Sequence, residues 1–131
     1  MLVENVMTAK DKLVIVSQMN ALKVALQRMK KHRVKTVIVD KASPSGAYGL
    51  VTFNNILQAI VSEDGDIELL NIYDVSTIPA ISVSKKMDIK YAARMMVNSG
   101  IKRLLVIDNN ELEGILTMSD IVNVLLENME E

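Results

Sequence analysis

The sequence predicts an α/β fold in which two β-α-β-β-α units pack as one pseudo-symmetric pair. A nine-residue stretch occurs twice, at 49–57 and 114–122, with its glycine, its threonine and an isoleucine at the same places. The halves also match before this stretch. At an offset of 67 positions the identical pairs are Val16 and Val83, Ala25 and Ala92, Met29 and Met96, and Val39 and Val106. Because a half of roughly 60 residues closes a core poorly alone, we expect the pair to be the stable unit.

The first half alternates between β-branched runs, which predict strands, and apolar residues at helical spacing, which predict amphipathic helices. A short lead-in, helical or extended, comes first, and a turn rich in serine, proline and glycine separates the second and third strands. In order, the expected elements are the lead-in at 3–8, a strand at 13–16, a helix that ends near residue 32, strands at 37–39 and 48–51, and a helix at 53–61.

The second half repeats this order after a polar stretch at 62–66, which marks a boundary between repeats 1–66 and 67–131. A short connector at 67–73, predicted to be helical, leads into it. The expected elements are a strand at 78–83 with Pro79 near its start, a helix at 87–98, strands at 104–107 and 112–116, and a helix at 119–128.

Composition limits the functional classes. The 131 residues contain 15 Lys and Arg against 16 Asp and Glu, so no basic field predicts binding to nucleic acid or to a membrane. The absence of cysteine excludes disulfides and fits a reducing cytoplasm. No signal peptide or membrane span is visible. A hydrophobic fraction of 50% and a positive mean hydropathy predict apolar surface that is buried against a partner, most simply in a homodimer.

The repeated nonamer has two interpretations. Thr117 and Asp120 fit a capping box, in which a side chain at the start of a helix and one three residues later each accept a backbone N–H. A hydroxyl and a carboxylate at a helix N-terminus can also hold a ribose diol, and the helix dipole favours a phosphate nearby. Both roles can hold together.

Each tandem unit ends in glycine, two apolar residues, threonine and a polar residue three positions later. This unit resembles the CBS domain family, whose paired form is the Bateman module. In the second half, residues 99–108 followed by 114–120 are close to the family pattern, with Leu105 where a proline is common. The resemblance covers nearly the whole chain. It implies two small sheets that face each other, with clefts that bind adenine nucleotides.

The resemblance also assigns roles in the second repeat. Thr117 and Asp120 match ribose-contacting positions, Ser119 lies between them, and Arg103 matches a phosphate-contacting arginine with Lys102 beside it. Four apolar strand positions match the wall of the adenine site: Val14, Val34, Ile81 and Ile101.

The first repeat departs from this pattern. Thr52 and Asn55 occupy its ribose positions, and Lys35 and Thr36 lie where phosphate contacts are expected. Asn55 offers one neutral carbonyl acceptor, and Thr36 lacks the planar fork of an arginine. We therefore expect the second site to be the better one.

The expected function is a non-catalytic module that binds AMP, ADP or ATP in the cleft between the repeats and signals to an unknown target protein. No resident cofactor or metal is expected, because the chain has one histidine, no cysteine and no glycine-rich phosphate loop. Two alternatives stay open. The ligand could be an S-adenosylmethionine-type compound, or the chain could be a ligand-free dimerisation scaffold in which Thr117 and Asp120 only cap a helix.

Overall fold

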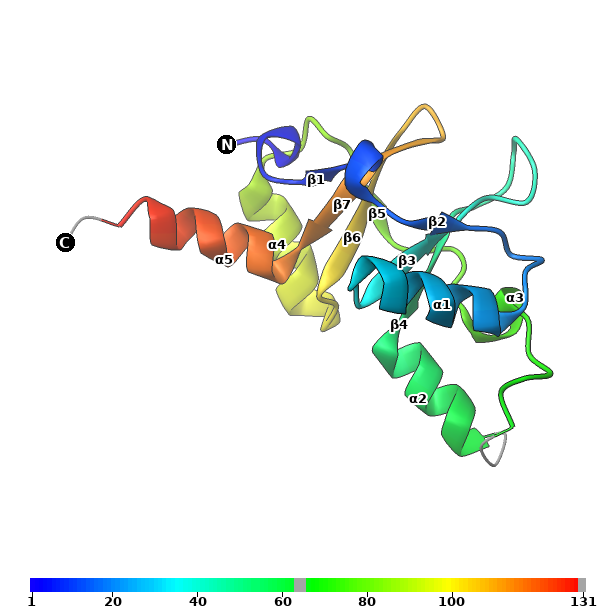
Figure 1. The fold of residues 1–131 in the computed structure, drawn as a ribbon. Coiled ribbons are helices and arrows are strands. Elements are labelled where there is room, and N and C mark those ends of the chain that lie inside the picture. Colours follow the sequence, from blue (N-terminus) through cyan, green and yellow to red (C-terminus); the bar gives the residue numbers. More distant parts are fainter. Residues whose placement is uncertain (63–65, 130–131) are drawn as a thin grey trace. The chain divides into compact units, whose positions relative to one another are not determined.

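The computed structural model describes residues 1–62 and 66–129, in which five α-helices alternate with the strands of two small sheets (Figure 1). The chain forms two compact units. The continuous unit is Leu13–Ala80, and the composite unit combines Met1–Lys12 with Ile81–Glu131. These units are not the segments expected as repeats, 1–66 and 67–131, and the boundary predicted at 62–66 lies mostly outside the described residues.

The continuous unit contains a three-stranded sheet in the order β2-β3-β4. Strand β2 is parallel to β3, and β3 is antiparallel to β4, so the crossover between β2 and β3 requires a helix and the β3–β4 connection does not. Its elements are β2 (Ile15–Val16), α1 (Leu22–His32), β3 (Thr36–Val39), β4 (Gly49–Thr52), α2 (Phe53–Ser62) and α3 (Ile72–Val75).

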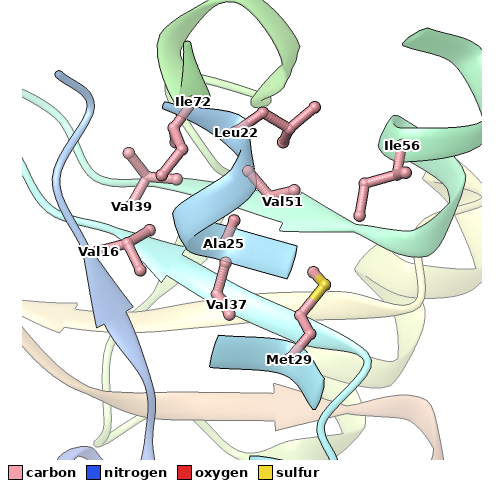
Figure 2. Packing of buried hydrophobic residues seen from close by; sticks show 9 residues of the cluster. All are labelled: Val16, Leu22, Ala25, Met29, Val37, Val39, Val51, Ile56 and Ile72. Carbon is pink, nitrogen blue, oxygen red and sulfur yellow. The ribbon is translucent and has the colours of Figure 1, made fainter. Parts of the chain in front are cut away.

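The core of this unit lies between the sheet and its helices (Figure 2). Helix α1 buries Leu22, Ala25 and Met29, whose spacing of three and four residues places them on one face. They pack with valines from all three strands, and α2 and α3 contribute one buried isoleucine each. The other members of this cluster are Val16, Val37, Val39, Val51, Ile56 and Ile72.

The composite unit repeats this arrangement with one additional strand. Its sheet has the order β1-β7-β6-β5, with β5 parallel to β6 and β6 antiparallel to β7. The elements are η1 (Val3–Asn5), β1 (Thr8–Ala9), η2 (Lys10–Lys12), β5 (Ser82–Val83), α4 (Ile89–Ser99), β6 (Arg103–Asp108), β7 (Glu111–Thr117) and α5 (Met118–Glu127). Each unit thus contains one β-α-β-β-α set, which confirms the predicted α/β fold.

Three predicted elements are shorter than expected. The strand predicted at 13–16 covers only Ile15–Val16, and the strand predicted at 78–83 only Ser82–Val83. The helix predicted at 67–73 is Ile72–Val75, which overlaps the prediction only at residues 72 and 73. Residues 77–80 pair elsewhere: Thr77 forms an antiparallel bridge with Leu50, and the Ala80 N–H donates to the Tyr48 carbonyl at 2.9 Å. The segment before β5 therefore belongs to the continuous unit and cannot extend β5.

The lead-ins of the two repeats are exchanged. The lead-in before the first repeat packs in the composite unit, where Leu2 bridges to Asp88 and β1 pairs with β7 (Figure 1). The lead-in before the second repeat packs in the continuous unit, where Asn71 bridges to Ala21. Fully burying one valine or isoleucine contributes roughly 1.5–3 kcal/mol. Each lead-in buries one completely, Val3 and Ile72.

A third sequence repeat accompanies this exchange. Residues 3–8 and 72–77 match at an offset of 69, with Val6 and Thr8 identical to Val75 and Thr77. The match is short, and its offset differs from the 67 positions that relate the strands and helices. The structure explains it, since both segments make one helical turn and then meet the last strand of a sheet.

The repeated glycine of the nonamer is explained by the same contact. A Cβ added to Gly114 would strike the carbonyl oxygen of Thr8, and one added to Gly49 would lie 2.7 Å from the carbonyl oxygen of Thr77. In both places the lead-in backbone approaches too closely for any side chain. The glycine is therefore a packing requirement of the exchange.

Replacing Gly114 with alanine should consequently lower the free energy of unfolding by about 1–3 kcal/mol, the usual cost of overpacking. Chemical denaturation of Gly114→Ala against wild type measures this. Gly46→Ala is the control, because its new Cβ would lie 3.2 Å from the nearest atom, the Ser43 carbonyl oxygen, in a turn. Equal stability losses in the two variants would contradict the close-approach explanation.

Candidate functional site

Thr117 and Asp120 form a capping box at the start of α5. The Asp120 N–H donates to Thr117 Oγ1 at 3.1 Å, and the Thr117 N–H donates to Asp120 Oδ2 at 2.9 Å. The structural interpretation of these two residues is therefore correct. Capping leaves both side chains able to bind a ligand, because a carboxylate has about four lone-pair positions and the threonine hydroxyl still has its own proton to donate.

Arg103 faces this cap across the sheet. It begins β6 directly opposite Thr117 of β7, so both side chains stand on the same face of the antiparallel pair. The Lys102 carbonyl accepts the Met118 N–H at 2.9 Å, which joins the two strand ends. Arg103 is half-buried, while Lys102 and Ser119 are exposed.

These residues surround a pocket of about 330 Å³, near the lower limit of small-molecule sites. Four of the residues assigned from the sequence line it together: Lys102, Arg103, Thr117 and Ser119. Met118 also lines it. Sequence reasoning did not select Met118, although it stands inside the repeated nonamer between two residues that were selected. Asp120 is connected to the pocket through Thr117.

The first repeat has the same register but a different hydrogen-bond pattern. Thr36 lies opposite Thr52, as Arg103 lies opposite Thr117. Asn55 Oδ1 accepts both the N–H and the hydroxyl of Thr52, at 2.9 and 3.0 Å, and Asn55 Nδ2 donates to Thr77 Oγ1 at 3.4 Å. Among the described residues, no equivalent hydrogen bond joins Asp120 to Thr8. The cap of the first repeat is therefore hydrogen-bonded to a lead-in through Asn55, and the cap of the second repeat is not.

Asn55 lines a different pocket, of about 410 Å³, whose other walls come from α2, α3 and Leu70. Lys35 and Thr36 are not part of its lining, and Lys35 is exposed. The structure thus gathers the predicted phosphate and ribose residues around one pocket in the second repeat, and does not do so around this pocket in the first.

The four positions predicted for the adenine wall lie just outside the strands. Val14 and Ile81 precede β2 and β5, and Val34 and Ile101 lie between a helix and the next strand, so their placement in strands is wrong. Val14 and Val34 pack against the core of the continuous unit, and Ile101 packs against that of the composite unit. Ile81 is 48% exposed. The Val14 and Ile81 carbonyls still accept a strand N–H, from Ile38 at 2.9 Å and from Leu105 at 3.0 Å, so these two residues lie at the start of the parallel ladders.

Charged groups at the far end of β6 stabilise the composite unit. Asp108 accepts the Lys85 N–H at 3.0 Å and the Ser84 hydroxyl at 2.8 Å, and these two bonds lower the pKa of its carboxyl. The Lys90 N–H lowers the pKa of the Asp88 carboxyl in the same way, and the Glu4 carboxylate raises the pKa of the Lys86 amine. The Lys86–Glu4 ion pair, at 2.8 Å, connects this end to the lead-in.

Because the pKa of Asp108 is lower in the folded chain, its contribution to stability is present above pH about 3.9 and is lost as the pH falls through the folded pKa. Asp108→Asn should therefore reduce the loss of unfolding free energy between pH 5 and pH 2 relative to wild type. Denaturation at a series of pH values measures the slope. Asp11→Asn, which changes an exposed carboxylate of η2, is the control, and the same reduction in slope there would contradict the assignment.

Residues 1–62 and 66–129 lack two features, a metal-binding cluster and a membrane-spanning helix. In that part of the chain, no three histidine, cysteine or acidic residues gather in a way that could hold a metal ion. In the same residues, no helix combines the length and the hydropathy needed to cross a bilayer.

Comparison with known proteins identifies the fold. The family model of the CBS domain matches residues 72–127, which include the Thr117–Asp120 cap and Arg103. This part of the chain is similar to a CBS domain. The match extends from α3 to the last residue of α5 and so covers the second β-α-β-β-α set entirely.

Solved CBS-domain structures extend the fold over the whole chain. A hexameric CBS-CP12 protein from bloom-forming cyanobacteria has a TM-score of 0.85 at 23% identity and covers 100% of this chain and 76% of its own. CBSX2 in complex with AMP has a TM-score of 0.82 at 21% identity, covering 98% and 99%. An uncharacterized conserved protein from Pyrococcus horikoshii has a TM-score of 0.82 at 20% identity, covering 99% and 96%. The fold is consistent with a tandem CBS pair.

A curated relative, an uncharacterized protein from Methanopyrus kandleri, is 31% identical over 100 residues. The alignment covers 74% of this chain and 50% of the relative, so the chain spans about half the length of that protein.

Proposed function

We propose that this chain is a non-catalytic regulatory CBS module that binds an adenine nucleotide at the Thr117–Arg103 pocket and transmits its occupancy to a partner protein. The observation that carries the proposal is the pocket itself. It places a cation, a capped helix N-terminus and a hydroxyl around one space of about 330 Å³. AMP occupies a CBS-domain protein of the same fold, CBSX2.

The chemistry of the pocket matches a nucleoside phosphate. Arg103 supplies a guanidinium, which recognises phosphate oxygens in a two-pronged geometry. Thr117 and Asp120 retain a donor and acceptors for a ribose diol after capping the helix. The first turn of α5 adds the positive end of a ten-residue helix. An S-adenosylmethionine-type ligand would use the ribose contacts without the phosphate contact.

Calorimetric titration with AMP, ADP, ATP and S-adenosylmethionine tests this proposal. We expect a phosphate-bearing ligand to bind, and Asp120→Asn to weaken it by roughly 1.5–3 kcal/mol, the range for hydrogen bonds to charged groups, or about tenfold or more in affinity. Arg103→Gln should weaken the phosphate-bearing ligands but not the adenosyl compound.

The matched control is Arg94→Gln, which makes the same chemical change at an exposed position of α4 beside Tyr91. Unliganded melts show whether each variant remains folded. If no adenosine compound binds wild type, the nucleotide proposal is wrong and a ligand-free scaffold is favoured. Equal affinities for wild type and Asp120→Asn would show that Asp120 only caps the helix.

We also propose that the module is a homodimer, because its exposed apolar residues are themselves repeated. Helices α2 and α5 each carry an exposed stripe at positions i, i+4, i+7 and i+8. The members match at the nonamer's offset of 65: Phe53 with Met118, Leu57 with Val122, Ile60 with Leu125, and Val61 with Leu126. Exposed stripes of this kind mark association surfaces, and a two-fold interface uses the same surface twice.

Sedimentation equilibrium should therefore give a dimeric mass at tens of micromolar. The double variant Leu57→Asp and Leu125→Asp should be monomeric, because each change places a charge in the apolar stripe of one helix. In the single chain Leu57 is 61% exposed and Leu125 is 59% exposed. Val97→Asp, on α4 and 76% exposed, is the control and should remain dimeric. A monomeric wild-type mass would mean that the stripes cover a different surface.

A further inference from the structure

The turns that enter α1 and α4 are built alike. In each, the hydroxyl oxygen of a serine accepts the N–H two residues later at 3.2 Å. The carbonyl oxygen of the same serine accepts the N–H three residues later, at 3.2 Å before α1 and 3.1 Å before α4. The serines are Ser17 and Ser84, related by the offset of 67. Their shared hydrogen bonds hold the two turns in one conformation.

A carboxylate completes this turn in the composite unit. Asp108, at the end of β6, accepts the Ser84 hydroxyl at 2.8 Å and the Lys85 N–H at 3.0 Å. The two donors converge on the carboxylate, one on each oxygen. This arrangement is a carboxylate site that the chain fills with its own side chain.

The continuous unit lacks that side chain. Lys41 stands 67 positions before Asp108, so an ammonium group replaces the carboxylate. Gln18 replaces Lys85, and within residues 1–62 and 66–129 its N–H has no hydrogen-bond acceptor. Gln18 is nevertheless only 8% exposed. A pocket of about 250 Å³ opens here, lined by Ser17, Gln18, Asp40 and Lys41 together with apolar atoms of β2.

A second acidic group is missing at the same turn. Asp88 caps α4 by accepting the Lys90 N–H at 2.9 Å, whereas its counterpart Ala21 gives α1 no side-chain cap. The N-terminus of this eleven-residue helix therefore keeps more of its positive character. The pocket also lies beyond the carboxyl ends of the parallel strands β2 and β3, a common position for ligands in α/β sheets.

The charges that face the pocket limit the ligand. Lys41 Nζ contacts the Pro44 carbonyl at 3.4 Å and lies 5.5 Å from the Tyr48 ring, so it is held near the loop. Asp40 Oδ1 accepts the Lys41 N–H at 2.9 Å and adds one negative charge. With one cation and one anion in the lining, the pocket suits a singly charged anion better than a multiply charged one.

We propose that this pocket binds the carboxylate group of a small molecule, which takes the place that Asp108 occupies in the composite unit. One carboxylate oxygen accepts the Ser17 hydroxyl and the other accepts the Gln18 N–H, while Lys41 neutralises the charge. The site is separate from the Thr117–Arg103 pocket, and its residues all belong to the continuous unit.

Acetate titration followed by amide NMR tests the proposal in the intact chain. We expect saturable shifts at Ser17, Gln18 and Lys41. Lys41→Asp supplies an internal carboxylate. It should therefore raise the melting temperature and lower the affinity for acetate by about tenfold or more. Ser17→Ala removes one donor and should weaken acetate while keeping the site open. Inorganic phosphate is the comparison anion, and it should bind more weakly than acetate.

Lys30→Asp is the matched control, because it makes the same charge change at an exposed position of α1 that does not line the pocket. It should leave the acetate affinity unchanged. The proposal is overturned if acetate shifts none of the three amides, if Lys30→Asp and Lys41→Asp weaken acetate equally, or if phosphate binds more tightly than acetate. Nucleotide binding does not enter this test, so either proposal can fail alone.

Discussion

The antiparallel contact between each lead-in and the last strand of the other repeat is the constraint on which the rest of the structure depends. The approach is so close that the strand must carry a glycine at Gly49 and at Gly114. It also brings Val3 and Ile72 to full burial, each in the core of the other repeat's unit. Because the lead-ins are exchanged, neither repeat completes its core from its own sequence segment. The repeats of the sequence and the compact units of the fold therefore have different boundaries.

The nonamer serves this constraint and the candidate nucleotide site with different residues. Its glycine admits the lead-in, and its threonine and polar residue cap the following helix in both repeats. The polar capping residue, Asn55 or Asp120, decides which hydrogen bonds remain available after capping. Asn55 donates from its amide nitrogen to Thr77 of the lead-in, whereas Asp120 caps a helix whose first residues border a pocket that Arg103 lines. The first copy thus bonds to its lead-in, and the second borders the pocket proposed for the nucleotide.

The same division between the repeats occurs at the opposite ends of the sheets. In the composite unit, Asp108 and Asp88 satisfy the donors of the turn before α4. In the continuous unit, Lys41 and Ala21 stand at the matching positions, and the turn borders a pocket. The two turns share one hydrogen-bond pattern, but Asp108 fills one of them and the other borders a pocket. The comparison of the two units is informative because the carboxylate that fills the turn of the composite unit indicates the chemical group that the turn of the continuous unit could bind.

The sequence by itself determined the two β-α-β-β-α sets, the bounds of the four long helices within a few residues, the capping pairs Thr117–Asp120 and Thr52–Asn55, and the pairing of Arg103 with the second cap. These depend on local hydrophobic period, capping chemistry and register, which nearby residues encode. Only the tertiary structure decided that residues 1–12 join the second repeat, that Thr77 pairs with β4 instead of extending β5, and that Lys41 and Ser17 line the same pocket. Those features come from contacts between segments far apart in the chain, and local hydrophobic period does not specify which distant segments pair.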